Sequence, residues 1–285
     1  MTDTDDDDAP DLMLGYRSVD EQPNTSILVT GMDTTAGWPA VRQLRAWERR
    51  RLALTDGESL LDVGCGPGHV VIDLSSAVAP TGSALGVDVS DAMVNEARRR
   101  AAEAGAAVEF QVADALSLPV ATGTIDACRS ERMLQWVPDI ERAARELVRV
   151  LRPGGRLVLT DTDWGSMTLD LPDSELVGSV LRAMQAARGP GFRVGAHLVN
   201  LMRDLGLVEI DCTAATHVWI EWDPDAGPDV TGFFPIRFVL PQLADAGLVD
   251  RAAGERFIAA IEGAARRDRI FMSLTMYAVF GRKPA

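Results

Sequence analysis

The sequence predicts an α/β fold organised around a parallel sheet, and three observations support this prediction. Short apolar runs of the kind found in buried strands alternate with stretches of helical periodicity. The first run, Leu60–Val63, leads into the glycine-rich turn Gly64–Gly68 and then into a helical stretch. A second run, Leu85–Val89, holds Asp88 near its carboxyl end. Strand, glycine turn, helix and a later acidic residue together predict a nucleotide-binding unit.

Composition limits the class of protein. A chain of 285 residues, 47% hydrophobic and 25% charged, can bury a sizeable core, and its length predicts one α/β domain with an appended lid. The net charge of −14 argues against a nucleic-acid partner, which would need a basic face. The sequence has no long apolar run and no basic-then-apolar leader, so we expect no membrane partner and a cytoplasmic location. The oligomeric state is not readable from these features.

The elements follow in order from apolar periodicity and from helix start and stop signals. Residues 1–11 contain six aspartates and predict a disordered acidic tail, whereas 12–35 shows no clear periodicity. The helix expected next has Pro39 in its first turn, and a later helix has Ser90 as its N-cap and Gly105 at its end. The predicted helices are 38–54, 69–77, 91–104, 138–151, 173–188, 193–205, 234–245 and 249–266. The predicted strands are 60–63, 85–89, 107–112, 124–128, 156–160, 207–219 and 270–281.

Two groups of side chains are expected to have no role in binding or catalysis. The first helix carries arginines that we expect in solvent: Arg45, Arg49, Arg50 and Arg51. Three cysteines fall in or beside predicted strands, and we expect them to be small buried side chains: Cys65, Cys128 and Cys212. Their wide spacing forms no metal-binding pattern, so no metal site is predicted.

The spacing of the glycines distinguishes between two ligands. A dinucleotide fingerprint, G-x-G-x-x-G, needs its third glycine at position 69, where this chain has His69. The chain has G-x-G-x-G instead, which disfavours a nicotinamide dehydrogenase. The helix that begins at His69 presents unpaired N–H groups to the turn, which suits a carboxylate of the ligand.

The chain resembles the class I S-adenosylmethionine (SAM) dependent methyltransferases of small molecules, such as those of ubiquinone and menaquinone biosynthesis. The resembling segments, in the family's order and spacing, are LLDVGCGPGHV, GVDVSDAM, Ala113-Asp114-Ala115 and RVLRPGGRLVLTDTDW. The resemblance implies a Rossmann-like seven-stranded sheet, parallel except for its last strand. It also implies helices on both faces, helical lid insertions, and SAM as the cofactor.

This resemblance divides the chain into four parts. After the tail 1–11, residues 12–57 form an N-terminal helical segment or lid, and 58–165 form the SAM-binding core. The remaining residues, 166–285, complete the sheet and carry inserted helices over the substrate.

The resemblance also implies where the cofactor is held. Asp88 is expected to hold ribose hydroxyls, and Asp114 the exocyclic amine of adenine, unless Asp114 caps a turn instead. Tyr16 is expected either in the lid or packed on the core. The full set of expected cofactor contacts is Asp62, Gly64, Cys65, Gly66, Gly68, Asp88, Val89, Met93, Asp114, Ala115, Ser130, Glu131 and Tyr16.

Three side chains are candidates for a general base: Asp163, His197 and Glu131. Of these, His197 has the most suitable unperturbed pKa. Similar enzymes often carry a histidine where this chain has Trp136, so a mechanism that uses that histidine does not transfer. The Trp136 indole is expected either to hold a flat or cationic substrate or to pack in the core.

These observations predict transfer of a methyl group from SAM to a small-molecule acceptor, at oxygen or carbon, by in-line displacement. Two alternatives stay open. An enzyme could bind SAM as an electrostatic cofactor for a cyclisation or decarboxylation, or the chain could be a non-catalytic SAM-binding protein. The residues do not identify the acceptor.

Overall fold

The structure is a computed structural model that describes the chain except for residues 1–15, 17, 23 and 226–235, and except for the side chains of 236–238. The predicted acidic tail, 1–11, therefore lies outside the described residues. Within the described residues, no helix combines the length and apolarity needed to cross a membrane.

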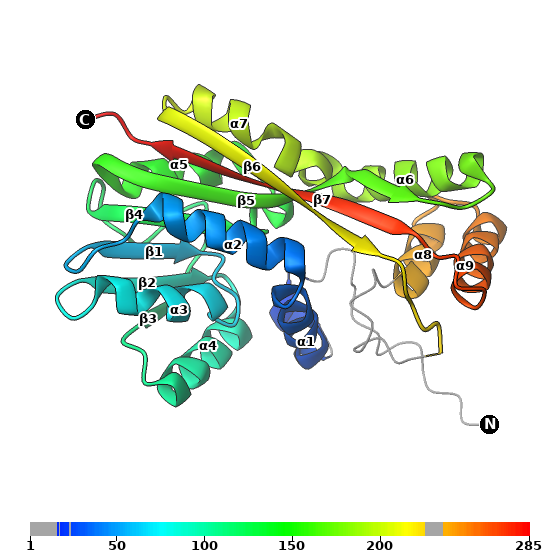
Figure 1. The fold of residues 1–285 in the computed structure, drawn as a ribbon, viewed down its shortest axis with the longest axis horizontal. Helices are drawn as coiled ribbons and strands as arrows, with labels where there is room; N and C mark the ends of the chain where they lie inside the picture. The colour runs from blue at the N-terminus through cyan, green and yellow to red at the C-terminus, as the bar shows by residue number, and fades with distance from the viewer. Residues whose placement is uncertain (1–15, 17, 23, 226–235) are drawn as a thin grey trace.

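A single seven-stranded sheet forms the centre of the molecule, in the order β3-β2-β1-β4-β5-β7-β6 (Figure 1). The strands are β1 (Ser59–Val63), β2 (Ser83–Asp88), β3 (Glu109–Val112), β4 (Ile125–Glu131), β5 (Leu151–Leu169), β6 (Val208–Trp219) and β7 (Met272–Arg282). All neighbouring pairs are parallel except those of β7, which runs antiparallel to both β5 and β6. The predicted sheet, parallel with an antiparallel last strand, is confirmed.

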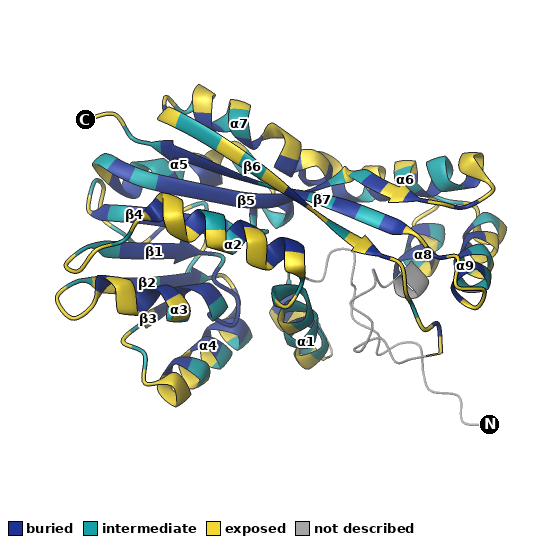
Figure 2. Ribbon diagram, in the orientation of Figure 1, coloured by how far each residue is buried: buried dark blue, intermediate teal, exposed yellow. Residues whose placement is uncertain are grey.

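Helices cover both faces of the sheet, as predicted, because alternate side chains of a strand point to opposite faces. In β1, Leu60 joins a buried cluster with Leu74 of α3, whereas Leu61 joins another with Leu147 of α5. Figure 2 shows the central strands buried and the outer sides of the helices exposed. The helices are α1 (Thr25–Ala36), α2 (Pro39–Leu52), α3 (His69–Val78), α4 (Asp91–Ala104), α5 (Ile140–Val150), α6 (Ser174–Arg188), α7 (Val194–Asp204), α8 (Ile236–Asp245) and α9 (Arg251–Ala265). The part of the chain that the structure describes also contains the short 3-10 helices η3 (Val19–Glu21), η4 (Leu134–Trp136) and η5 (Gly189–Arg193).

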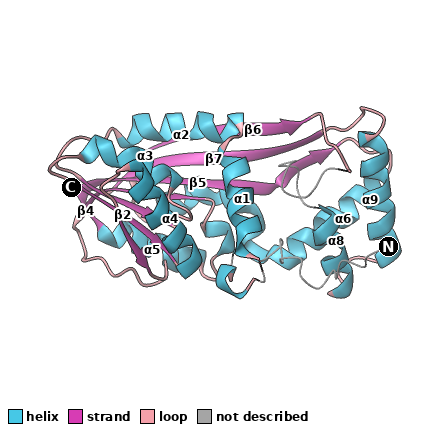
Figure 3. Ribbon diagram, turned by 90° about the horizontal axis from the view of Figure 1, so that it is seen from below, coloured by secondary structure: helices cyan, strands magenta, loops and turns pink. Residues whose placement is uncertain are grey.

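Strands β5, β7 and β6 form an antiparallel ribbon that extends well beyond the parallel strands (Figure 3). The sequence predicted that the fifth strand ends at Thr160, but β5 continues to Leu169. It continues because β7 pairs with it along most of its length, across a register shift between Asp163 and Thr168. The inserted helices α6, α8 and α9 gather at the far end of the ribbon and share a hydrophobic core with it.

Helix α1 was not predicted, because its sequence, TSILVTGMDTTA, has no continuous apolar stripe. The side chain of Asn24 caps it by accepting a hydrogen bond from the Ser26 N–H. Leu28, on its inner side, is fully buried in a cluster with Met93 at the start of α4. Tertiary packing therefore supplies the stability that helical periodicity does not.

The cysteine prediction holds for two of the three side chains. Cys65 and Cys128 are buried, but Cys212 is exposed, so the prediction of three buried cysteines is wrong for this residue. Cys212 lies on β6, the edge strand, where one neighbour is missing and alternate side chains reach solvent.

Candidate active site

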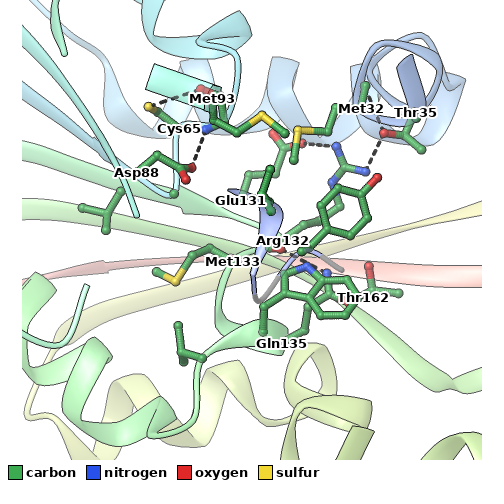
Figure 4. Close-up of a pocket in the computed structure, with 18 of the residues that line it drawn as sticks. Met32, Thr35, Cys65, Asp88, Met93, Glu131, Arg132, Met133, Gln135 and Thr162 are labelled. Carbon is green, nitrogen blue, oxygen red and sulfur yellow. Dashed lines mark hydrogen bonds and ion pairs between the residues drawn. The ribbon is translucent and has the colours of Figure 1, made fainter. Parts of the chain in front are cut away.

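A cavity of about 470 Å³ lies at the carboxyl ends of β1, β2 and β4, beside α1, and extends along the start of the ribbon. One part, the glycine-loop half, is lined by Gly64–Pro67, His69, Val70, Asp88, Val89, Met93 and Ala113–Leu116. The other part, the aromatic half, is lined by Tyr16, Trp38, Gln135, Trp136, Thr162, Trp164, Arg188, Trp219, Leu274 and Met276. Figure 4 shows Glu131 and Arg132 between Asp88 on one side and Thr162 on the other. Open parallel sheets place ligands at this edge, so the location agrees with the predicted one.

The glycine loop brings its backbone directly to the cavity. Gly64 and Gly66 have positive φ angles of 72° and 52°, which glycine adopts without strain. A Cβ on Gly64 would lie 2.4 Å from the Met133 Cγ, and one on Gly66 would lie 3.1 Å from the Met32 Sδ. A side chain at either position would therefore displace a methionine that lines the cavity.

Gly68 has a different role from the one predicted. Its φ is 84°, and a Cβ there would meet the interior side chains Ala97 and Phe110 rather than the cavity. Gly68 does not appear among the described residues that line the cavity. It lets the chain turn tightly into α3, whose first residues, His69 and Val70, do line the cavity.

Asp88 ends β2 and faces the glycine loop. Its carboxylate accepts hydrogen bonds from the N–H groups of Gly66 at 2.8 Å and Ser90 at 3.0 Å. Burial raises the pKa of this carboxyl, and the two N–H groups oppose that rise. Val89 and Met93 also line the cavity, so the structure brings together the three residues predicted after the second strand.

Asp114 and Ala115 line the same half of the cavity, after β3. One Asp114 carboxylate oxygen, Oδ1, accepts a hydrogen bond from the Leu116 N–H at 2.8 Å. This is the turn-capping role that the sequence left open. Because the side chain is exposed and lines the cavity, its carboxylate also faces the site.

Asp62 and Ser130 were predicted to contact the cofactor, but neither is among the described residues that line the cavity. Asp62 is 1% exposed and accepts a charge-assisted hydrogen bond from the Arg129 guanidinium at 2.7 Å. Ser130 is buried in β4, where Arg129 and Glu131 on either side of it reach the cavity wall. Strand alternation turns Ser130 to the opposite face.

Glu131 lies in the cavity wall at the centre of a cluster of arginines. Arg45 of α2 grips it with two hydrogen bonds of 2.8 Å, and Arg129 and Arg132 approach it at 2.9 and 3.2 Å. Burial alone would raise the pKa of Glu131, but the charges of Arg45 and Arg132 outweigh it and hold the pKa well below its usual range. A carboxylate held in this way is a poor proton acceptor, which argues against Glu131 as the base.

The same cluster corrects the prediction for Arg45, which was expected in solvent. Its side chain is only 20% exposed and lines the cavity, because it reaches from α2 to the end of β4. Helical periodicity placed Arg45 on the polar face with Arg49 and Arg50, which are indeed exposed. Sequence alone carried no sign that β4 would offer it a buried partner.

The structure does not bring Asp163 and His197 into the site. Asp163 was expected after a strand but lies within β5, where Thr162 and Trp164 take the cavity-facing positions. The Asp163 carboxylate accepts instead from the Arg193 guanidinium at 3.2 and 3.4 Å. His197 is exposed on α7 and is not among the described residues that line the cavity. Neither is placed to accept a proton from a ligand there.

The aromatic half contains a buried arginine that sequence reasoning missed. Arg188, the last residue of α6, is 2% exposed and lines the cavity. Its guanidinium carbon lies 4.4 Å from the centroid of the Trp136 ring and 4.1 Å from that of Trp164. Trp136 was noted from the sequence, but a terminal helix arginine resembles an ordinary surface residue until the fold is known.

Tyr16 also lines this half of the cavity. Its place beside the cavity agrees with one of the two predicted placements. Its ring centroid lies 5.3 Å from that of Trp136, and its hydroxyl donates to the Leu28 carbonyl at 3.3 Å. Burial raises the pKa of the Tyr16 phenol, although the charges of Arg132 and Arg188 oppose this. The phenol therefore stays protonated at neutral pH.

The chain is similar in sequence to known methyltransferases. The family model for the methyltransferase domain matches residues 61–159. An uncharacterized 37.1 kDa protein in transposon TN4556 of Streptomyces fradiae is 37% identical over 82% of this chain and 68% of its own length. The demethylmenaquinone methyltransferase of Lactococcus lactis is 36% identical over 41% of this chain, and the match covers 47% of that enzyme.

Solved structures agree with the fold. The YcgJ protein of Bacillus subtilis superposes with a TM-score of 0.57 at 19% identity, over 86% of this chain and 99% of its own. This likeness concerns the fold alone, whereas the sequence matches cover the glycine loop and the end of β2. The chain belongs to the class I SAM-dependent methyltransferases.

Proposed function

We propose that the protein transfers a methyl group from SAM to a small-molecule acceptor, at an oxygen or a carbon atom. The strongest support for this proposal is that one cavity combines two surfaces of different chemistry. The glycine-loop half offers backbone and two carboxylates, those of Asp88 and Asp114, and the aromatic half offers indole rings and an arginine. The demethylmenaquinone methyltransferase named above also acts, by its name, on a small molecule.

The residues of the glycine-loop half fit SAM. Asp88 would accept from the ribose hydroxyls, and Ala113–Leu116 with Val89 and Met93 would enclose the adenine. The methionine end carries a carboxylate, which suits the unpaired N–H groups at the start of α3 and the guanidinium of Arg45. Because Gly64 and Gly66 have no side chains, SAM could approach their backbone closely.

When bound, SAM supplies a methyl group on a positively charged sulfonium. The protein's residues align the acceptor with that methyl group and exclude water from the cavity. Glu131 and its arginines form the wall between the two halves and keep their charges paired. Thr162, Trp164 and Trp136 shape the acceptor side.

Calorimetric titration of the wild type and Asp88→Ala with SAM, S-adenosylhomocysteine and NAD tests the cofactor assignment. We expect the wild type to bind both adenosyl ligands and not NAD. Loss of two charge-assisted hydrogen bonds should weaken binding by about 100-fold or more in the variant. Asp73→Ala, an exposed aspartate of α3 outside the described lining of the cavity, is the matched control and should bind as the wild type does.

Product mass then tests the reaction itself. Acceptors screened with the SAM-loaded protein should gain one methyl group while S-adenosylhomocysteine accumulates. A product of unchanged composition would show instead that SAM is held for another step, such as a cyclisation. Preference for NAD over the adenosyl ligands would overturn the cofactor assignment.

A further inference from the structure

We propose that Arg132 binds the acceptor directly, by donating hydrogen bonds to a carbonyl oxygen of that molecule. This inference rests on the proposed function and adds a class of substrate to it: acceptors that carry a ketone, an ester or another carbonyl group. An analogue of the same shape without this oxygen would bind less well. The support comes from the backbone of Arg132, from the hydrogen bonds of its guanidinium and from its place in the cavity.

The backbone turns Arg132 toward the cavity at the end of β4. Along this strand Arg129 and Glu131 line the cavity, whereas Ser130 between them does not. Strand alternation would send the next side chain, that of Arg132, to the same face as Ser130. Arg132 instead has a left-handed backbone with a φ of 55°, which residues other than glycine rarely adopt, and it lines the cavity beside Glu131. Strained backbone of this kind is concentrated at sites that bind ligands.

Neighbouring groups hold this backbone on both sides. The Arg132 N–H donates to the Thr160 carbonyl at 2.7 Å, and the Arg132 carbonyl accepts from the Gln135 side-chain amide at 3.2 Å. The strained turn is therefore part of the fold. Because the side chain of Arg132 starts from a fixed backbone, little order has to be created when a ligand binds to it.

The guanidinium of Arg132 has more N–H groups than the protein uses. It has five, of which one donates to the Thr35 hydroxyl at 2.7 Å. Its other terminal nitrogen lies 3.2 Å from the Glu131 carboxylate (Figure 4). The Nε–H is buried without a partner, and no described residue accepts from the second N–H of either terminal nitrogen. The side chain is 21% exposed and lines the cavity, so a ligand oxygen at this wall would supply a missing acceptor.

The other two arginines around Glu131 are less suited to bind the acceptor. Arg129 is 2% exposed, and all three nitrogens of its guanidinium donate to carboxylates. Arg45 holds Glu131 with two of its nitrogens. The three arginines of this cluster are balanced by three carboxylates, those of Glu48, Asp62 and Glu131. The inference therefore rests on unused N–H donors rather than on an excess of positive charge, and a neutral carbonyl oxygen is a sufficient partner for them.

Arg132 also lies on the acceptor side of Glu131. Burial raises the pKa of the Tyr16 phenol in the aromatic half, and the charge of Arg132 is the largest effect that opposes this rise. Burial lowers the pKa of the His69 ring in the glycine-loop half, and the charge of Arg45 adds to that lowering. Because such effects weaken with distance, the two arginines lie toward different halves of the cavity. Arg45 is thus the better partner for the methionine carboxylate of SAM, and Arg132 for the acceptor.

A carbonyl oxygen in this place would also assist the chemistry. Hydrogen bonds from a guanidinium stabilise negative charge on that oxygen, so a C–H or O–H group conjugated with the carbonyl loses its proton to solvent more easily. The electron pair that remains forms the bond to the methyl carbon, and the electrons of the breaking carbon–sulfur bond stay on sulfur. An acceptor of this class therefore does not need a base at the moment of transfer, which agrees with the positions of Asp163 and His197 outside the site.

The test compares two probes of one shape: 2-acetylnaphthalene, which has a carbonyl oxygen, and 2-isopropenylnaphthalene, which has a methylene group in its place. Each is titrated calorimetrically into the full chain saturated with S-adenosylhomocysteine. We expect the ketone to bind at least about tenfold more tightly than the alkene. In Arg132→Met this preference should fall to within about twofold, whereas Arg132→Lys, which keeps a donor, should retain part of it.

Arg145→Met is the matched control and should keep the wild-type preference, because Arg145 is 58% exposed on α5 and pairs with Glu141. Affinity for S-adenosylhomocysteine is measured for every variant and separates the two proposals. If the wild type fails to bind it, the proposed function fails. If the wild type binds it but the ketone and the alkene bind equally, or Arg132→Met keeps the preference, the carbonyl-bearing acceptor is refuted. Loss of affinity for S-adenosylhomocysteine in Arg132→Met, with the ketone preference unchanged, would assign Arg132 to the cofactor and also refute the inference.

Discussion

Neighbouring side chains of β5 point to opposite faces of the sheet, so Asp161 and Thr162 have different surroundings. Thr162 faces the cavity, whereas Asp161 is buried on the other side, 1% exposed. The Asp161 carboxylate accepts from the N–H groups of Gln135 at 3.2 Å and Thr162 at 2.8 Å. It thereby holds the short helix η4 that carries Gln135. Burial raises the pKa of Asp161 to about 7, because these N–H groups offset only part of the desolvation.

This raised pKa predicts how stability depends on pH. Between about pH 4 and 7 the folded protein keeps a proton on Asp161 that the unfolded chain has lost. Stability therefore falls as pH rises through this range, by up to about 4 kcal/mol from this group. In Asp161→Asn that component should disappear, although one N–H group loses its acceptor at every pH. Thermal unfolding of both proteins is followed from about pH 5 to pH 8. The Tm of the wild type minus the Tm of Asp161→Asn should fall as pH rises. A difference that stays constant or increases would refute the raised pKa of Asp161.

At the scale of residues, sequence reasoning succeeded where a motif fixes the backbone. Gly64, Gly66, Asp88 and Met93 line one cavity, since the strand–turn–helix unit dictates where they lie, and their contact with the cofactor stays a prediction. It failed where a role depends on a partner distant in sequence, as for Arg188 between two tryptophans.

Among the elements, α1 covers the glycine-loop half and is tied to the core by charge. Asp33 on α1 contacts Arg100 of α4 at 2.7 Å and the His69 ring of α3 at 2.6 Å. Met32 and Thr35, on either side of Asp33, line the cavity. This ion pair between partly exposed side chains therefore adds to the packing of Leu28 in holding α1 beside the cavity.

Weakening the Asp33–Arg100 ion pair should reduce the affinity for SAM more than the stability of the fold. Asp33→Asn removes an exposed ion pair worth at most about 1 kcal/mol, so Tm should hardly change. The Kd for SAM should rise by up to about fivefold, because α1 closes less firmly over the cavity. Glu103→Gln breaks the Arg99–Glu103 pair on α4 and is the control. A Kd that changes equally in both variants would contradict a role for α1 in closing the site.

Elements with strong periodicity were placed well by the sequence, and others were not. Helix α4 was expected over 91–104 and spans Asp91–Ala104, since a cap at Ser90 and a glycine at 105 define its ends. The extension of β5 to Leu169 and the existence of α1 follow from pairing with β7 and packing on α4. Those contacts lie far apart in sequence, where local periodicity carries no information.

Seen as a whole, the molecule has separate hydrophobic cores at its two ends. One covers one face of the parallel strands and includes Leu74 of α3, and another joins the ribbon to α6, α8 and α9 and includes Phe257. The sheet connects them without a break. The two ends should therefore unfold with different stabilities, as locally packed units do.

Two cavity-forming substitutions test this separation. Phe257→Ala removes a fully buried ring from α9 and should lower the free energy of unfolding by about 3 to 5 kcal/mol, mainly at the far end of the ribbon. Leu74→Ala should cost about 2 to 5 kcal/mol around the glycine loop. Urea unfolding followed by hydrogen exchange should show that each variant loses protection first at its own end. The affinity for SAM should fall in Leu74→Ala alone. One transition common to both ends, with affinity lost equally, would show a single cooperative unit.

The family match ends at Leu159, inside β5, a few residues before this strand reaches the aromatic half. The stretch that the family model covers thus stops before the aromatic half, yet both lie on one uninterrupted strand. We therefore expect that replacing the distal segments at this strand leaves the glycine-loop half intact, since the strand keeps the register of whatever follows. For protein engineers, β5 marks a natural crossover point at which new acceptor specificities can be grafted.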